Sequence, residues 1–381
     1  MTRSDPETWH LATTESEFLD LQSDWERLFA KNPKHSPFLA WGWVDAWLRH
    51  IAGPHELLIA SLRDSSGELV FVLPLLKPDG SGLFGAAQVT LVCSYGPECS
   101  ENLGCLYDVN FASRSAELTL SAITEFVGSH ETISLRCLED YESYPSSLEV
   151  EVRRSGRTVR VRHDVFCPTT HLPGSWDEYL LQLSSNFRSQ VRRSFKQIGG
   201  EGQPRFRQLA ASDADVFTSE LVRLNRSRIQ EKGDVSSLED GAFRRFLHEA
   251  IPYMASQGIA WMDVIEKSDE TLGSALNFVH GESICYYMGG FDSKAGKLRP
   301  GTALFALAMQ RGIDSGFTMF NFLRGDEHYK YRWGAEDAPT RQVTIYPAGF
   351  LRGKLMLAMD TLFIVARRLL SSLRNILKRR S

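Results

Sequence analysis

The residues with the clearest chemical potential surround a basic loop that ends near residue 302. Its cations and the residues that follow them are Lys294, Lys297 and Arg299, then Pro300, Gly301 and Thr302. A β-branched and aromatic run at residues 283–288 predicts a strand before the loop, and the apolar spacing from Thr302 predicts a helix after it. The start of a helix attracts anions through its unpaired N–H groups and its dipole, and a glycine lets the backbone approach them closely. We therefore expect this loop to bind a phosphate-bearing ligand.

Two common phosphate-binding motifs do not describe this loop. The sequence contains no G-x-x-x-x-G-K-[ST] motif. The spaced glycines Gly80, Gly82 and Gly85 lie elsewhere and are not followed by a good helix start, so they do not predict a dinucleotide-binding turn. A second strand is predicted at residues 319–323. The order strand, basic loop, helix, strand indicates a phosphate-bearing ligand without a nucleotide-hydrolysis motif.

A cluster of ionisable residues follows this second strand. It contains Asp326, Glu327, His328 and Lys330. Because α/β folds place ligands beyond strand ends, one of these side chains could take a proton from a nucleophile or anchor a substrate. Lys330 could pair with Glu327 or bind an anionic group of a substrate. The alternative is an internal ion pair, with Asp326 and His328 as turn and surface residues.

Other catalytic chemistries lack their motifs. The sequence has no G-x-S-x-G elbow of a serine hydrolase, and its ten histidines are scattered. Cys93, Cys99 and Cys105 are evenly spaced, but the Cys-x2-Cys pairs and nearby histidines of a zinc site are missing. We expect buried thiols and no metal.

The composition is that of an ordinary globular protein. The 381 residues are 43% hydrophobic and 24% charged, with a net charge of −4. Such a chain has no global attraction for nucleic acid, so no nucleic-acid partner is expected. The N-terminus lacks the apolar core of a signal peptide, and no stretch reaches the roughly 18 apolar residues of a membrane span. These features predict a cytoplasmic protein.

The predicted elements divide the chain into three parts: residues 1–165, 166–347 and 348–381. Both larger parts combine helices with strands, which predicts an α/β (α+β) fold. In the second, the tight turns between three strands suit antiparallel hairpins before the strand–helix–strand unit. The first contains the tryptophans Trp41, Trp43 and Trp47, for which core packing is favoured over a ligand groove.

Two stretches concentrate positive charge. A predicted helix at residues 187–198 carries Arg188, Arg192, Arg193 and Lys196 opposite its apolar face. This face is either a clamp for an anionic ligand or a solvated surface. The tail carries an apolar stripe, with eight cations between residues 352 and 380 and a single acid, Asp360. It could lie on an anionic membrane surface or pack against its own domain.

The ordered set of motifs from residue 287 to 333 resembles a known family. The runs are Tyr287-Met288-Gly289-Gly290-Phe291-Asp292, then Pro300-Gly301, then Asn321-Phe322-Leu323-Arg324-Gly325-Asp326-Glu327-His328-Tyr329-Lys330-Tyr331-Arg332-Trp333. They resemble the acetyltransferases grouped with the CelD protein of cellulose biosynthesis, which are GNAT-like and related to the FemAB-type aminoacyl transferases. The resemblance reaches residues 36–47, and so covers most of the chain.

This resemblance implies tandem GNAT-like domains, each a mixed, mostly antiparallel sheet flanked by helices. Residues 1–165 would be a degenerate copy, residues 166–347 the acyltransferase domain and residues 348–381 a basic helical tail. Acetyl-CoA or another acyl-CoA would be the co-substrate. The cofactor-binding residues would be Tyr287, Phe291, Arg299, Pro300, Gly301 and Thr302, and the catalytic residues Glu327, Lys330 and Arg228. Four positions depart from the family pattern or match it only in part: Arg299, Asn321, Asn225 and Ile229.

The sequence-based prediction is an N- or O-acetyltransferase for a sugar, a polysaccharide precursor or a small metabolite. Its partner would be a small-molecule or saccharide acceptor, and the tail could add peripheral contact with the inner membrane surface. Two alternatives stay open. One is FemAB-like transfer of an aminoacyl group from charged tRNA, and the other is a non-catalytic ligand-binding protein on the same fold.

Overall fold

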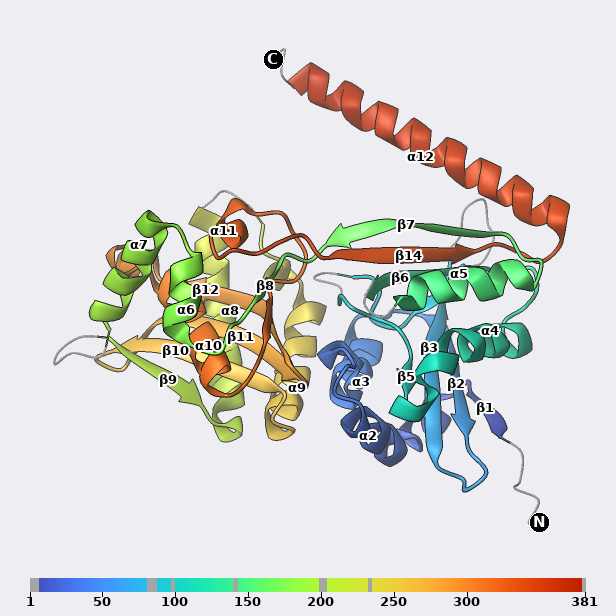
Figure 1. The fold of residues 1–381 in the computed structure, drawn as a ribbon, viewed down its shortest axis with the longest axis horizontal. Coiled ribbons are helices and arrows are strands. Elements are labelled where there is room, and N and C mark those ends of the chain that lie inside the picture. The colour runs from blue at the N-terminus through green and yellow to red at the C-terminus, as the bar shows by residue number, and fades with distance from the viewer. Residues whose placement is uncertain are drawn as a thin grey trace.

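The structure is a computed structural model and describes residues 7–80, 88–96, 100–139, 143–198, 204–231 and 235–378. Two β-sheets lie side by side, each with helices packed against it (Figure 1). The helices are α1 Glu15–Leu19, α2 Gln22–Lys31, α3 Trp41–His50, α4 Ser115–Phe126, α5 Tyr144–Arg154, α6 Trp176–Gln182, α7 Ser185–Lys196, α8 Ala214–Glu231, α9 Gly241–Ser256, α10 Pro300–Asp314, α11 His328–Tyr331 and α12 Phe350–Lys378.

The first sheet has the strand order β1-β2-β3-β4-β6-β14-β7, and the short β5 also pairs with β3. Its strands are β1 Thr8–Ala12, β2 His55–Arg63, β3 Leu69–Pro78, β4 Gln88–Leu91, β5 Leu106–Tyr107, β6 Thr132–Glu139, β7 Val159–Phe166 and β14 Pro339–Ile345. The central strands β2 and β3 are almost continuously apolar because both of their faces are buried. Asp64 closes the turn between them, its side chain accepting from the backbone N–H groups of Ser66 and Glu68.

The second sheet has the order β8-β13-β12-β11-β10-β9. Its strands are β8 Thr169–His171, β9 Arg205–Leu209, β10 Ala260–Lys267, β11 Glu270–His280, β12 Ser283–Phe291 and β13 Met319–Asn321. The pair β12–β13 is parallel and every other pair is antiparallel. The first sheet likewise has one parallel pair, β4–β6, among antiparallel ones. The predicted fold class, two mixed and mostly antiparallel sheets flanked by helices, is confirmed.

One strand crosses between the two halves of the sequence. β14 follows the helices and strands of the second sheet, yet it pairs with β6 and β7 of the first sheet. A cut at residue 165 therefore does not separate the two sheets, because the first sheet is completed from residues 339–345. The local sequence of this strand carries no signal for the sheet that it joins.

The two halves share one hydrophobic core, in which α3 packs against α9 (Figure 1). Gly42 on α3 permits this contact, since a Cβ there would come within 2.1 Å of the Tyr253 ring on α9. The predicted core position of the tryptophans is confirmed, because Trp41, Trp43 and Trp47 are all buried. The ring of Trp43 meets Phe278 of the second sheet at 5.1 Å, which joins the halves through aromatic packing.

Candidate functional site

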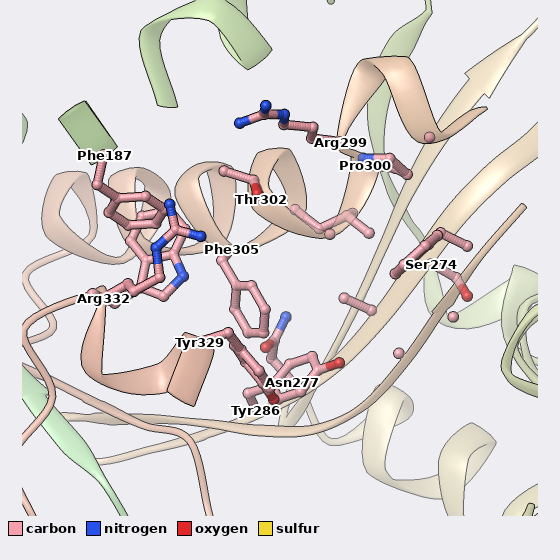
Figure 2. A pocket seen from close by; sticks show the side chains of 18 residues that line it. Phe187, Ser274, Asn277, Tyr286, Arg299, Pro300, Thr302, Phe305, Tyr329 and Arg332 are labelled. Carbon is pink, nitrogen blue, oxygen red and sulfur yellow. The ribbon is translucent and has the colours of Figure 1, made fainter. Parts of the chain in front are cut away.

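The site begins where β12 and β13 separate. The two strands pair in parallel only over residues 283–285 and 319–321, after which β12 continues to Phe291 without this partner. The pairing of β11 with β12 also shifts register between Leu276 and Asn277. A cavity of about 350 Å³ opens beside β12, bounded by the first turn of α10 and by residues of α7 and α11 (Figure 2).

Aromatic side chains form the inner wall of this cavity, which we call the donor cavity. Tyr286 lies 4.5 Å from Phe305, and Phe187 lies 4.8 Å from Trp333, measured between ring centroids. Tyr329 packs against Phe305 at 5.7 Å. Such a wall suits an extended, mainly apolar part of a ligand.

The glycines of β12 bring this strand close to its neighbours. A Cβ on Gly290 would lie 2.3 Å from the backbone nitrogen of Asn225 on α8, so only glycine allows the observed packing. The side-chain amide of Asn225 in turn donates to the carbonyl of Gly289. The approach of α8 therefore requires a glycine at position 290.

Two arginines stand at the mouth of the donor cavity, beside the N-terminus of α10. Arg299 is the N-cap residue of α10 and has a left-handed backbone with φ of 51°. Its Nη1 donates to Oε1 of Gln190 at 2.6 Å, and Nη2 of Arg332 donates to the same oxygen at 2.8 Å. Over the described chain, neither arginine forms an ion pair with a carboxylate. Two like charges held by a neutral amide, next to a helix N-terminus, favour a bound anion.

The inner wall also holds two polar atoms without a hydrogen-bond partner. The side chains of Ser274 and Asn277 are buried, and within the described residues neither Ser274 Oγ nor Asn277 Oδ1 has a hydrogen-bond partner. Both residues line the donor cavity (Figure 2). Because buried polar atoms normally have partners, these two atoms indicate that a ligand supplies one.

A buried ion pair behind the wall fixes the orientation of Asn277. Its Nδ2 donates to Oδ2 of Asp263 at 3.0 Å, and Asp263 accepts from Arg311, whose guanidinium lies 3.4 Å from the Trp261 ring. Burial raises the pKa of Asp263, whereas its contacts with Arg311 and Asn277 act in the opposite direction. The carboxylate of Asp263, paired with Arg311, can only accept hydrogen bonds. The amide nitrogen of Asn277 therefore faces Asp263, and its Oδ1 faces the cavity.

A smaller cavity of about 120 Å³, which we call the acceptor cavity, lies on the other side of Tyr286 and Tyr329. Tyr286 and Tyr329 line both cavities. Among the described residues of the first half, Glu101 lines this cavity; it is 3% exposed and paired with Arg324 of the second half. Its remaining lining residues are Tyr287, Phe322, Leu323, Glu327 and Lys330.

Lys330 is held by the backbone. Its side chain is 2% exposed, and Nζ donates to the carbonyls of Leu323, Arg324 and Gly325 at 3.1, 2.6 and 3.2 Å. Three carbonyls use the three N–H groups of an ammonium, so we assign Lys330 to fixing this turn. The turn needs such support because Leu323 has a left-handed backbone with φ of 54°.

Glu327 lies at the edge of the acceptor cavity. Its side chain is 56% exposed and lies 2.9 Å from Nζ of Lys330. The internal ion pair that the sequence left open is thus present, yet one side of the carboxylate remains accessible to a ligand. Arg228 lies on α8, but its side chain is outside the described part of the structure.

The predicted cofactor-binding residues divide between the two cavities. Phe291, Arg299, Pro300, Gly301 and Thr302 line the donor cavity. Tyr287 lines the acceptor cavity instead, packed near Trp43, because neighbouring residues of a strand face opposite sides. Its neighbour Tyr286, in contrast, lines the donor cavity and also borders the acceptor cavity. The sequence analysis also missed the other polar and aromatic lining residues, Phe187, Ser274, Asn277, Phe305, Tyr329, Arg332 and Trp333.

The basic face of α7 reaches solvent. Arg192, Arg193 and Lys196 are exposed, whereas Arg188 is half-buried and donates to the carbonyl of Leu180. Phe187 on the opposite face packs on Trp333 in the donor cavity. The cations of α7 therefore surround the outside of the site and do not line it.

The described residues contain no group of three or more His, Cys, Asp or Glu side chains that could hold a metal ion. Five cysteines are buried and free, Cys93 and Cys105 among them, whereas Cys99 lies outside the described residues. Within the described chain, no helix has the length and apolar character needed to cross a membrane.

Comparisons with known proteins agree with this geometry. Residues 185–331 match the family model described as an acetyltransferase (GNAT) domain. The solved structure of FemX aligns at 12% identity and a TM-score of 0.59, covering 89% of this chain and 97% of that chain. The C-terminal domain of a putative lysylphosphatidylglycerol synthetase from Agrobacterium fabrum aligns at 12% identity and a TM-score of 0.54, covering 91% of this chain and 97% of that chain. No curated protein sequence matches the chain.

Residues 185–331 therefore match a GNAT acetyltransferase domain. At these identities, the likeness to the solved structures shows a common fold that extends over both sheets.

Proposed function

We propose that the protein transfers an acyl group from an acyl-CoA, such as acetyl-CoA, to an amino or hydroxyl group of a small-molecule or saccharide acceptor. The observation that carries this proposal is the junction of the two cavities at Tyr286 and Tyr329. A donor that enters past the α10 N-terminus and an acceptor that enters between the halves would meet there.

The parts of the donor cavity would suit the chemical groups of an acyl-CoA. Arg299, Arg332 and the first turn of α10 would bind the phosphates at the mouth. The aromatic wall would bind the arm that leads to the thioester. Oδ1 of Asn277 would accept from an amide N–H of this arm, and Oγ of Ser274 can donate or accept.

In the reaction the acceptor nitrogen or oxygen attacks the thioester carbonyl, and a C–N or C–O bond forms while the C–S bond breaks. The acceptor loses one proton, and the thiolate takes one up. The accessible carboxylate of Glu327 is the proposed base or acceptor anchor, while Lys330 holds the turn that positions it.

The acceptor cavity adds a role for the first half of the chain. Glu101 and Arg324 present one negative and one positive group at its wall. We propose that this pair positions the acceptor, so that both halves build the site. The polysaccharide context remains a prediction from the family resemblance alone.

Calorimetric titration of acetyl-CoA and of CoA tests the donor site. We expect binding of both, weakened about tenfold or more by Arg299→Glu, because a charge-assisted hydrogen bond becomes a repulsion. The matched control is Arg192→Glu, which makes the same charge change on the exposed face of α7 and should leave the affinity unchanged. Absence of binding by either ligand would reject the proposal and favour a non-catalytic protein or a tRNA-dependent one.

A second candidate is transfer of an aminoacyl group from charged tRNA, as in FemAB-type enzymes. The likeness in fold to FemX over 89% of the chain and the exposed cations of α7 favour it. It predicts that charged tRNA is retained by the protein in a filter-binding assay and that Arg192→Glu with Arg193→Glu reduces this retention. Acetyl-CoA binding without tRNA binding would reject it.

A further inference from the structure

The helix α12 presents a row of apolar side chains to solvent. The exposed fractions are 82% for Leu351, 62% for Leu355, 70% for Leu362 and 49% for Val365. Spacings of 4, 11 and 14 residues from Leu351 place these four on one face of the helix. Single exposed leucines are common on protein surfaces, but a continuous row of them marks an interaction surface.

The opposite face of α12 is the one that contacts the body of the protein. Gly353 is buried, and a Cβ there would lie 2.7 Å from Oγ1 of Thr158. Two helical turns further along, Asp360 accepts from Arg160 at 2.9 Å and from the Tyr346 hydroxyl at 2.7 Å. These contacts fix the start of the helix with its apolar row turned away from the sheets, and α12 then extends past β7 (Figure 1).

The same apolar spacing continues in the sequence with Leu369, Leu373 and Ile376, up to the last turn of α12. The apolar spacing in the sequence thus runs along the whole of α12, which is 29 residues long. An apolar row on a helix rich in basic residues is typical of helices that lie in a membrane interface.

Charge distinguishes this helix from the rest of the chain. Residues 350–381 hold eight cations and one acid, whereas the preceding 349 residues hold 35 cations and 46 acids. The positive charge is thus concentrated in the segment that exposes the apolar row. Pairing with a second copy through this row would bring two strongly cationic helices together, whereas an anionic lipid surface attracts them.

We propose that α12 is a membrane-surface helix that docks the protein on a bilayer rich in anionic lipids. The row from Leu351 to Val365 enters the boundary between headgroups and acyl chains, and the flanking cations contact the lipid headgroups. This proposal does not depend on the acyl transfer proposed above.

Co-sedimentation of the full chain with lipid vesicles tests the proposal. One set of vesicles contains phosphatidylcholine alone, and the other contains phosphatidylcholine mixed with phosphatidylglycerol. We expect sedimentation with the anionic vesicles, at least about tenfold weaker binding to the neutral ones, and a loss of binding as salt is raised.

Three variants locate the surface. Leu355→Asp with Leu362→Asp places two charges in the apolar row and should lower vesicle affinity about tenfold or more. Arg352→Gln with Lys354→Gln should also lower it about tenfold or more, since both residues are exposed beside the row and each cation near an anionic surface contributes on the order of 1 kcal/mol. The matched control is Val216→Asp with Val235→Asp, which makes the same charge change at exposed positions of the body and should bind like the wild type.

Circular dichroism of each variant confirms that the fold is retained. Absence of binding to anionic vesicles, or binding that the substitutions in the row leave unchanged, overturns the proposal. A concentration-dependent dimer that the Leu355→Asp/Leu362→Asp variant abolishes, without vesicle binding, would assign the row to a second copy instead.

Discussion

At the scale of single residues, the site separates groups that hold the structure from groups that face a ligand. Lys330 has the burial and the chemistry often found in catalytic residues, but its ammonium is used by backbone carbonyls. Ser274 and Asn277 are less conspicuous in the sequence, yet they carry polar atoms without partners. The hydrogen bonds, and not the residue types, decide between these roles.

Lys330→Ala should therefore destabilise the protein. The substitution leaves three carbonyls of a left-handed turn without their donor, and we expect the free energy of unfolding to fall by about 3 kcal/mol. Urea unfolding followed by fluorescence measures this change. Glu327→Gln serves as the control and should cost less than about 1 kcal/mol, since this carboxylate is largely exposed. A Lys330→Ala protein of normal stability that has lost transferase activity would make Lys330 a catalytic residue after all.

Ser274→Ala should affect stability and binding in opposite ways. Removing a buried hydroxyl that has no partner leaves the unfolding free energy unchanged or raises it slightly, whereas the affinity for acetyl-CoA should fall about fivefold. Thermal unfolding and calorimetry measure the two quantities. The control Ser134→Ala removes a buried hydroxyl that accepts from Gln342, so it should lower stability and leave the affinity intact. Reduced stability with unchanged affinity in Ser274→Ala would show that the hydroxyl serves the fold.

At the scale of elements, the sequence predicts most segments that build the site. The apolar periodicity and the Pro-Gly-Thr start predict α10, which begins at Pro300. The alternation within β12 shows that Tyr286 and Tyr287 face opposite sides, but not which side carries the cavity. That depends on where β13 leaves β12, a tertiary event without a local sequence signal. Ser274 and Asn277 escape notice for the same reason.

The position of β14 within the first sheet leads to a prediction about how the two halves of the chain fold. A fragment of residues 1–165 lacks the strand that lies between β6 and β7, so we expect it to unfold without a cooperative transition. The fragment 1–347 should unfold cooperatively in urea. As a rescue control, residues 336–347 fused to the fragment 1–165 through a flexible linker should restore cooperativity. A cooperative transition of the fragment 1–165 alone would show that β14 is dispensable for the first sheet.

At the scale of the whole molecule, the first and second halves meet around neutral histidines. Nε2 of His35 accepts from the backbone N–H of Tyr107 at 3.1 Å. His280 of β11 stacks on Phe29 of α2 at 4.3 Å and contacts the carbonyl of Asn32. Burial and, second, the neighbouring His280 together lower the pKa of His35 to about 3, and burial also lowers the pKa of His280. The junction thus requires uncharged imidazoles.

Acid should therefore weaken this junction before it titrates the carboxylates. In the unfolded chain a histidine takes up a proton near its ordinary pKa of about 6.5, whereas folded His35 stays neutral down to about pH 3. Its contribution to stability is complete above about pH 6.5 and is lost as the pH falls from there toward 3, at up to about 1.4 kcal/mol per pH unit. Urea unfolding between pH 7 and pH 5 should show this slope, and His35→Gln should flatten it. His328→Gln, at an exposed position, should retain the wild-type slope. An equal slope in His35→Gln would mean that groups other than His35 set the acid sensitivity.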